Sequence, residues 1–153
     1  MFAKSITAVT LGVADLARSR AFYARLGWQA DEAQGGVVFI HLAGQMLCLF
    51  GIEDLAKDQG RERARLGTGA MTLARNFATE AEVDAAYALA LEAGGTALKR
   101  PEKVFWGGYS GYFADPDGHV WELAMNPFWE IGEDGTLQID VSATVCGGAS
   151  STS

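Results

Sequence analysis

An internal duplication constrains the fold of this chain more than any other feature of its sequence. Two matching segments, Val9–Leu11 and Met71–Leu73, lie about 60 residues apart. Each is followed by a helical pattern that carries a tyrosine, Tyr23 or Tyr87, and that ends at a glycine. A repeat of this length is too long for a solenoid and indicates a duplicated module.

The first module, residues 4–50, is predicted to be a βαβββ unit. Asp15 is placed to cap its helix, and Gly27 is placed to end it. Periodicity and turn residues predict its elements in chain order: strand 5–13, helix 16–26, a strand beginning at Trp28–Ala30, and strands 37–42 and 46–50.

A charged connector, residues 51–68, is expected to contain a short exposed helix and to lead into a second βαβββ module, residues 69–127. Thr79 and Glu82 form a capping-box pattern at the start of the second helix. The remaining predicted elements are a strand at 70–77, a short strand at 96–99 and a closing hairpin. We therefore expect one α+β domain over residues 4–135, in which two tandem modules form an open, curved mixed-sheet trough. Residues 136–153 are predicted to be a partly disordered tail.

The closing hairpin, residues 105–127, combines aromatic strands with a tight turn. The turn is Asp-Pro-Asp-Gly at 115–118, in which the proline fixes φ and the glycine accepts a positive φ. On the strand that follows, alternation places Glu122 on one face, between Val120 and Ala124. A carboxylate among apolar neighbours is costly to bury unless it is paired, so Glu122 is a candidate functional residue.

The hairpin resembles the last hairpin of the vicinal oxygen chelate superfamily, which includes glyoxalase I, extradiol dioxygenases and the bleomycin-resistance proteins. The resemblance rests on the Asp-Pro-Asp-Gly turn, on Glu122 four positions after the glycine, and on the Trp-Gly-Gly-Tyr-Ser-Gly-Tyr-Phe run at 106–113. It covers about residues 4–135 and implies the trough architecture described above. It implies less about function, because this fold hosts unrelated activities.

In metal-dependent members of the family, four side chains hold a divalent cation, and Glu122 matches the last of them. By the same alignment the other positions fall at Ala8, at Ala70 or Thr72, and near Cys48. His41 and His119 are the two histidines of the chain, and neither lies on the first strand of a module. Since one carboxylate does not hold a transition metal tightly, we expect no metal site and predict no cofactor.

Composition restricts the partners and the location of the protein. The chain has 153 residues, two cysteines and a formal net charge of −7. This charge argues against nucleic acid, whose backbone requires clusters of lysine and arginine. No apolar run approaches the roughly 20 residues that cross a bilayer. We expect a cytoplasmic protein that contacts neither membrane nor nucleic acid, and, by analogy with the family, a homodimer.

Five residues are candidates for ligand binding: Glu122, Trp106, Tyr109, Arg75 and Cys48. Arg75 could pair with Glu122 or reach solvent, and the sequence leaves both possibilities open. The aromatic residues lie beside glycines, which allow a flat ligand to approach closely, but strand aromatics also fill cores. Cys48 lies in an apolar strand, where cysteine is usually a small buried hydrophobe.

Three functions remain open: binding of a small molecule, metal-dependent catalysis, and a dimeric scaffold with no small-molecule role. The incomplete ligand set favours the first of them. In the first, the protein binds an aromatic or cationic small molecule without a metal and sequesters it, as bleomycin-resistance proteins do. In the second, it is a glyoxalase-like lyase, isomerase or dioxygenase that uses a divalent metal, with Glu122 as its one candidate catalytic residue.

Overall fold

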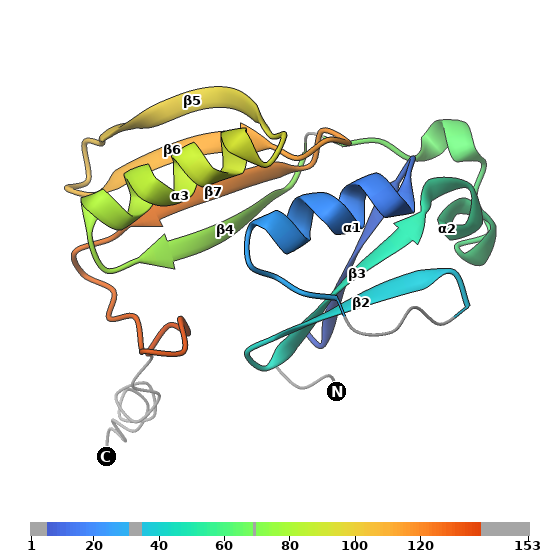
Figure 1. Ribbon diagram of the computed structural model, residues 1–153, viewed down its shortest axis with the longest axis horizontal. Helices are drawn as coiled ribbons and strands as arrows, with labels where there is room; N and C mark the ends of the chain where they lie inside the picture. The colour runs from blue at the N-terminus through green and yellow to red at the C-terminus, as the bar shows by residue number, and fades with distance from the viewer. Residues whose placement is uncertain (1–5, 31–34, 69, 139–153) are drawn as a thin grey trace, which may run out of the picture.

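The computed structural model describes residues 6–30, 35–68 and 70–138. The elements in these ranges are β1 (Ala8–Val13), α1 (Leu16–Arg25), β2 (Val37–Leu42), β3 (Gln45–Gly51), α2 (Ile52–Asp58), the 3-10 helix η1 (Arg63–Arg65), β4 (Thr72–Phe77), α3 (Glu80–Glu92), β5 (Thr96–Lys103), β6 (Tyr109–Ala114) and β7 (Val120–Met125). Figure 1 shows the two modules side by side, with α1 and α3 on the same side of the two sheets.

Both modules contain a mixed sheet in which the first and last strands of the module pair in parallel. The first sheet has the order β1-β3-β2, in which β1 is parallel to β3 and β2 is antiparallel to it. The second has the order β4-β7-β6-β5, in which β4 is parallel to β7 and the other pairs are antiparallel. The structure therefore confirms the α+β class and the duplicated arrangement expected from the repeat.

Helices α1 and α3 begin at the residues that the sequence indicates. The Asp15 side chain accepts a hydrogen bond from the backbone N–H of Arg18, at 2.9 Å. Thr79 and Glu82 form the reciprocal bonds of a capping box at the start of α3. These side chains satisfy backbone donors that have no partner within the first turn of a helix.

The strand expected to begin at Trp28–Ala30 is absent from those three residues, which have no regular structure. The reason is that Trp28 belongs to the end of α1. Gly27 has a φ of +91°, and the backbone N–H of Trp28 donates to the carbonyl of Tyr23 at 3.0 Å, as in a Schellman cap. The Trp28 ring then stacks on the Tyr23 ring, with centroids 6.0 Å apart. Helix capping and ring packing thus replace strand pairing at this point.

One hydrophobic core extends through both modules. It includes Leu11 and Val13 of β1, Phe113 of β6, and Trp121 and Leu123 of β7. Helix α1 contacts β3, and α3 contacts β6 and β7. The opposite faces of the two sheets carry the alternate residues of each strand. Each sheet therefore has one face covered by its helix and a second face that no α1 or α3 residue covers.

The turn at residues 115–118 joins the second module to the first. Asp115 is buried; its Oδ1 accepts hydrogen bonds from the backbone N–H groups of Asp117 and His119, both at 2.9 Å. The His119 Nε2 lies 2.8 Å from the carbonyl oxygen of Gly12. Asp117 Oδ1 accepts a hydrogen bond from the backbone N–H of Ala14, at 2.8 Å. This turn is therefore held against the end of β1, which fixes the junction between the modules.

Three smaller features complete the fold. As predicted, the connector contains a short helix, α2. Strand β5 is longer than predicted and reaches Lys103, with two register shifts against β6. The predicted tail begins at residue 136, and Leu137 within it forms an isolated bridge with Ile131. Residues 139–153 lie outside the described ranges. In the described part of the chain, every helix is too short or too polar to span a membrane.

Candidate ligand-binding site

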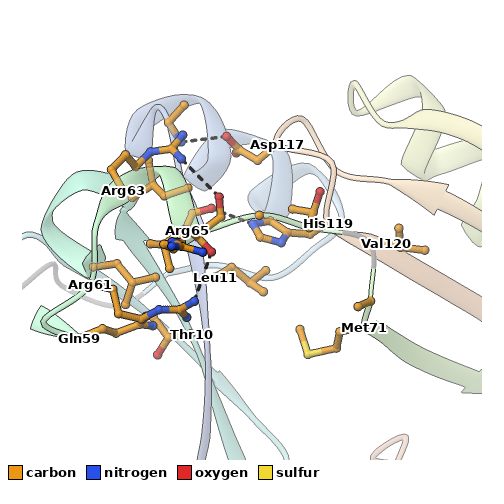
Figure 2. A pocket seen from close by; sticks show the side chains of 18 of the residues that line it. Thr10, Leu11, Gln59, Arg61, Arg63, Arg65, Met71, Asp117, His119 and Val120 are labelled. Carbon is orange, nitrogen blue, oxygen red and sulfur yellow. Dashed lines mark hydrogen bonds between the residues drawn. The ribbon is translucent and has the colours of Figure 1, made fainter. Parts of the chain in front are cut away.

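A cavity with a volume of about 880 Å³ lies at the junction of the two modules. The end of β1, helix α2 with the connector after it, the residues leading into β4, and the β6–β7 turn all contribute to its wall. Figure 2 shows arginines of the connector on one side of this cavity, with Asp117 and His119 on the other. We call it the junction cavity.

A glycine in β1 positions the wall that carries these arginines. A Cβ atom added to Gly12 would lie 3.0 Å from the Leu55 Cδ2 and 3.1 Å from the Ile52 Cγ1. Helix α2 therefore packs directly against the backbone of β1 at this point. The chain that leaves α2 then runs along the edge of the cavity, toward the start of β4.

Four arginines line the junction cavity, and they differ in how their charges are balanced. The Arg18 guanidinium forms an ion pair with Asp117, with 3.0 Å between nitrogen and oxygen. Arg63 forms one with Glu53, at 3.2 Å. Arg61 and Arg65 have no carboxylate within ion-pair distance anywhere in the described ranges. The connector therefore places two uncompensated positive charges at the cavity.

Asp117 is the acidic residue of the cavity wall, and its side chain is only 8% exposed. Its Oδ1 accepts the bonds from Ala14 and Arg18, whereas its Oδ2 has no hydrogen-bond partner among the described residues. A buried acceptor is stabilised by any donor that reaches it. A ligand hydroxyl, a ligand N–H group or water can supply such a donor.

The rest of the wall is mostly apolar. Leu55, Leu66, Met71 and Val120 all line the cavity. Met71 is 55% exposed, although it is a large hydrophobic residue. A cavity with an apolar wall and a few charged groups is typical of small-molecule sites.

Glu122 lies outside the junction cavity, on the face of the second sheet opposite α3. It is directly opposite Ala74 of β4 and Tyr112 of β6. Partial burial raises the pKa of the Tyr112 hydroxyl, and the charge of Glu122 and hydrogen bonding to its carboxylate raise it further. Glu122 therefore has a tyrosine as its neighbour on this face.

Arg75 and Glu122 lie on opposite faces of the sheet, so the pair considered from the sequence does not form. The register places Ala74 opposite Glu122, and Arg75 opposite Leu123. The Arg75 guanidinium donates to the carbonyl of Gly135 at 3.0 Å and lies 4.9 Å from the centroid of the Phe77 ring. Arg75 also lines a smaller cavity of about 270 Å³.

Trp106 and Tyr109 each have an intramolecular partner near the β5–β6 turn. A Cβ atom on Gly108 would overlap the Trp106 ring, so this ring lies against the glycine backbone. The Tyr109 hydroxyl donates to Asp84 of α3, at 2.9 Å. The glycine that the sequence suggested would admit a flat ligand instead accommodates the protein's own tryptophan.

Cys48 lies in the first sheet, opposite Thr10 and Phe39, and is 5% exposed. The five residues selected from the sequence are therefore spread over both sheets and both faces of the second sheet. None of them is among the residues that line the junction cavity. The structure does not bring them together into one site.

The residues present do not fit the family's four-ligand metal site. Ala8 supplies no donor atom, and the position near the end of the first module is occupied by buried Cys48. Across residues 6–30, 35–68 and 70–138, no three side chains of His, Cys, Asp or Glu come close enough to hold a metal ion.

The connector arginines are the residues that sequence reasoning missed as part of a site. Arg61, Arg63 and Arg65 recur at every second position within an otherwise polar segment. This spacing can be read from the sequence, but the side chains of a charged connector more often face solvent than line a cavity. Nothing in the sequence indicated that α2 would fold back onto Gly12 and bring these side chains to a cavity.

Comparison with known families identifies the chain. Residues 5–123 match the model of the Glyoxalase/Bleomycin resistance protein/Dioxygenase superfamily. The protein belongs to this superfamily. The match covers both modules up to the middle of β7, as the resemblance of the closing hairpin suggested.

Solved structures of the superfamily have the same fold. A glyoxalase-related enzyme from Fulvimarina pelagi is 34% identical with a TM-score of 0.82, and the match covers 90% of this chain and 99% of that one. A glyoxalase/bleomycin resistance protein/dioxygenase family enzyme from Burkholderia phytofirmans is 19% identical with a TM-score of 0.70, over 78% and 96% of the two chains. A lactoylglutathione lyase from Agrobacterium tumefaciens is 24% identical with a TM-score of 0.64, over 83% and 97%. The last two show the fold alone. Comparison with curated proteins gave no sequence match.

Proposed function

We propose that this protein binds a small molecule in the junction cavity and that it does so without a metal ion. The observation that carries the proposal is the cavity itself, about 880 Å³ in volume and lined by both modules and the connector. Ligand cavities in proteins commonly measure about 300–1,000 Å³. The site is therefore large enough for a compound of ordinary metabolite or drug size.

The donor set supports binding without a metal. Glu122 is the single residue that matches the family's ligand positions, and its sheet partners, Ala74 and Tyr112, add neither a histidine nor a carboxylate. The alternative function, a lyase, isomerase or dioxygenase that uses a divalent metal, has no further support from the described residues. A binding role, such as sequestration of the ligand, requires no catalytic group.

The proposed site does not include the residues selected from the sequence. Trp106 and Tyr109 are engaged with Gly108 and Asp84, and Arg75 lies across the sheet from Glu122. The sequence suggested a cationic ligand, but the uncompensated arginines of the junction cavity would repel a positive charge. The positive charge of the wall supports an anionic ligand instead.

A cavity-filling variant tests the proposal. A library of small molecules is screened by thermal shift, in the presence of EDTA, and the affinities of the hits are measured by calorimetry. We expect hits whose binding is lost in Met71→Trp, because the indole would occupy the cavity, and is retained in Leu98→Trp. Leu98 is a matched control because it is 54% exposed, against 55% for Met71, and it lies in β5 outside the cavity.

Two results would contradict the proposal. Hits that bind Met71→Trp as tightly as the natural protein would place the ligand elsewhere. Hits that require a divalent metal, and that disappear with EDTA, would show that binding depends on a metal.

A further inference from the structure

We infer that the ligand of the junction cavity carries an oxyanion group, a carboxylate or a phosphate, and that Arg61 and Arg65 bind this group. The inference rests on the proposed function and specifies the chemistry of its ligand. It comes from the distribution of charge around the cavity and from the donors that the wall presents.

The concentration of arginine at this site runs against the charge of the whole protein. The chain has 12 lysines and arginines against 19 acidic residues, yet four arginines line a single cavity that contains one carboxylate, Asp117. Arg18 is paired with that carboxylate, and Arg63 with Glu53. Arg61 and Arg65 therefore remain as the positive groups to which a ligand would supply the counter-charge.

The local backbone holds these two residues next to each other. The Arg61 Nη2 donates to the carbonyl oxygen of Arg65, at 3.3 Å. One nitrogen of Arg61 is thus fixed to the connector, and its other N–H groups are available. Figure 2 shows Arg61 and Arg65 on the same side of the cavity, opposite His119. Guanidinium groups present several N–H donors in a plane, which matches the oxygens of a carboxylate or phosphate.

The remainder of the wall defines the rest of the ligand. Thr10, Gln59 and Thr68 add neutral polar groups, while Leu66, Met71 and Val120 add apolar surface. Exposed arginines are usually solvated; what distinguishes this pair is that it lines the same cavity as apolar side chains. The arrangement suits a ligand with an oxyanion at one end and an apolar body.

Four small probes test the inference by calorimetry: phenyl phosphate, benzoate, benzyl alcohol and benzylammonium. They share one ring and differ in charge. We expect phenyl phosphate or benzoate to bind, more weakly as salt increases, and the neutral and cationic probes not to bind. If phenyl phosphate alone binds, the group is a phosphate; if benzoate alone binds, it is a carboxylate.

Arginine variants connect the binding to the connector. In Arg61→Ala and in Arg65→Ala, we expect the affinity for the anionic probe to fall by about tenfold or more, because a hydrogen bond to a charged group is lost. Arg65→Lys should retain part of the affinity. Arg100→Ala removes another exposed arginine, which lies in β5 outside the cavity, and should have no effect. Circular dichroism and thermal melting of each variant confirm that it is folded.

Three outcomes would overturn the inference: equal affinity for benzyl alcohol and phenyl phosphate, unchanged affinity in both arginine variants, or no binding by either anionic probe. After either of the first two outcomes, loss of binding in Met71→Trp would still support the junction cavity as a binding site. Binding that survives Met71→Trp would instead contradict the proposed function. The two failures are therefore distinguishable.

Discussion

The hydroxyl of Tyr23, in α1, donates a 2.7 Å hydrogen bond to the Oδ2 of Asp115, which lies 92 positions later at the β6–β7 turn. Both side chains are buried, and the Trp121 Nε1 donates to the same hydroxyl at 3.1 Å. This contact joins the first module to the turn that carries Asp117 and His119. It therefore fixes one wall of the junction cavity relative to the other.

Removing the Tyr23 hydroxyl should destabilise the protein. Tyr23→Phe leaves the Asp115 carboxylate and the Trp121 N–H without this partner, and an unsatisfied buried polar group costs about 1–3 kcal/mol. Urea denaturation measures the change in the free energy of unfolding. Tyr87→Phe is the matched control, because the Tyr87 hydroxyl is buried and has no hydrogen-bond partner among the described residues. Equal effects of the two substitutions would contradict the role given to the Tyr23–Asp115 bond.

The same contact predicts a dependence of stability on alkaline pH. Burial, and then the charge of Asp115, raises the pKa of Tyr23 far above its ordinary value of 10.0. Because the folded pKa is raised, the stabilisation is complete below pH 10 and is lost as the pH rises above 10, where the tyrosine of the unfolded chain ionises. The loss should approach about 1.4 kcal/mol per pH unit.

Urea midpoints between pH 8 and 11 measure this dependence. We expect the free energy of unfolding of the natural protein to decline more steeply above pH 10 than that of Tyr23→Phe. Tyr109 and Tyr112 also have raised pKa values, but both are present in the two proteins and their effects cancel in the comparison. Parallel pH profiles would contradict the prediction.

The capping box of α3 makes a separate contribution to stability. Thr79→Ala removes the acceptor for the Glu82 backbone N–H and should reduce the free energy of unfolding by about 1 kcal/mol. Thr79→Ser keeps a hydroxyl at the same place and should remain close to the natural protein. Thermal melting of both variants tests this prediction, which fails if serine and alanine have the same effect.

Trp106 should have no part in ligand binding if the ligand occupies the junction cavity. Its ring lies against Gly108 and is not among the residues that line the cavity, so Trp106→Ala should leave ligand affinity unchanged. Met71→Trp should abolish binding. Calorimetry with one ligand and both variants tests the pair. The opposite result, with loss in Trp106→Ala and none in Met71→Trp, would support the site selected from the sequence.

The sequence predicted the elements whose signals are local. Asp15, Thr79 and the 115–118 turn act through neighbouring backbone groups, so residue type and spacing were sufficient. The duplicated arrangement followed from the repeat. The face of β7 that carries Glu122 followed from alternation within one strand.

The features that the sequence did not predict depend on long-range packing. Whether Arg75 pairs with Glu122 depends on the register between β4 and β7, which no local signal specifies. Trp28 was expected to begin a strand, but the cap of α1 and the stacking on Tyr23 prevailed. The arginine wall depends on the contact between Gly12 and α2, which joins distant segments.

The most direct test of ligand binding at the junction cavity is NMR mapping. Backbone amide chemical shifts of the natural protein are followed during titration with phenyl phosphate or benzoate, whichever binds. We expect the perturbed amides to cluster at residues 59–68, at Met71 and at 117–120, which form or adjoin the wall of the junction cavity. Perturbations concentrated at 105–112 and around Glu122, with the connector unchanged, would contradict it.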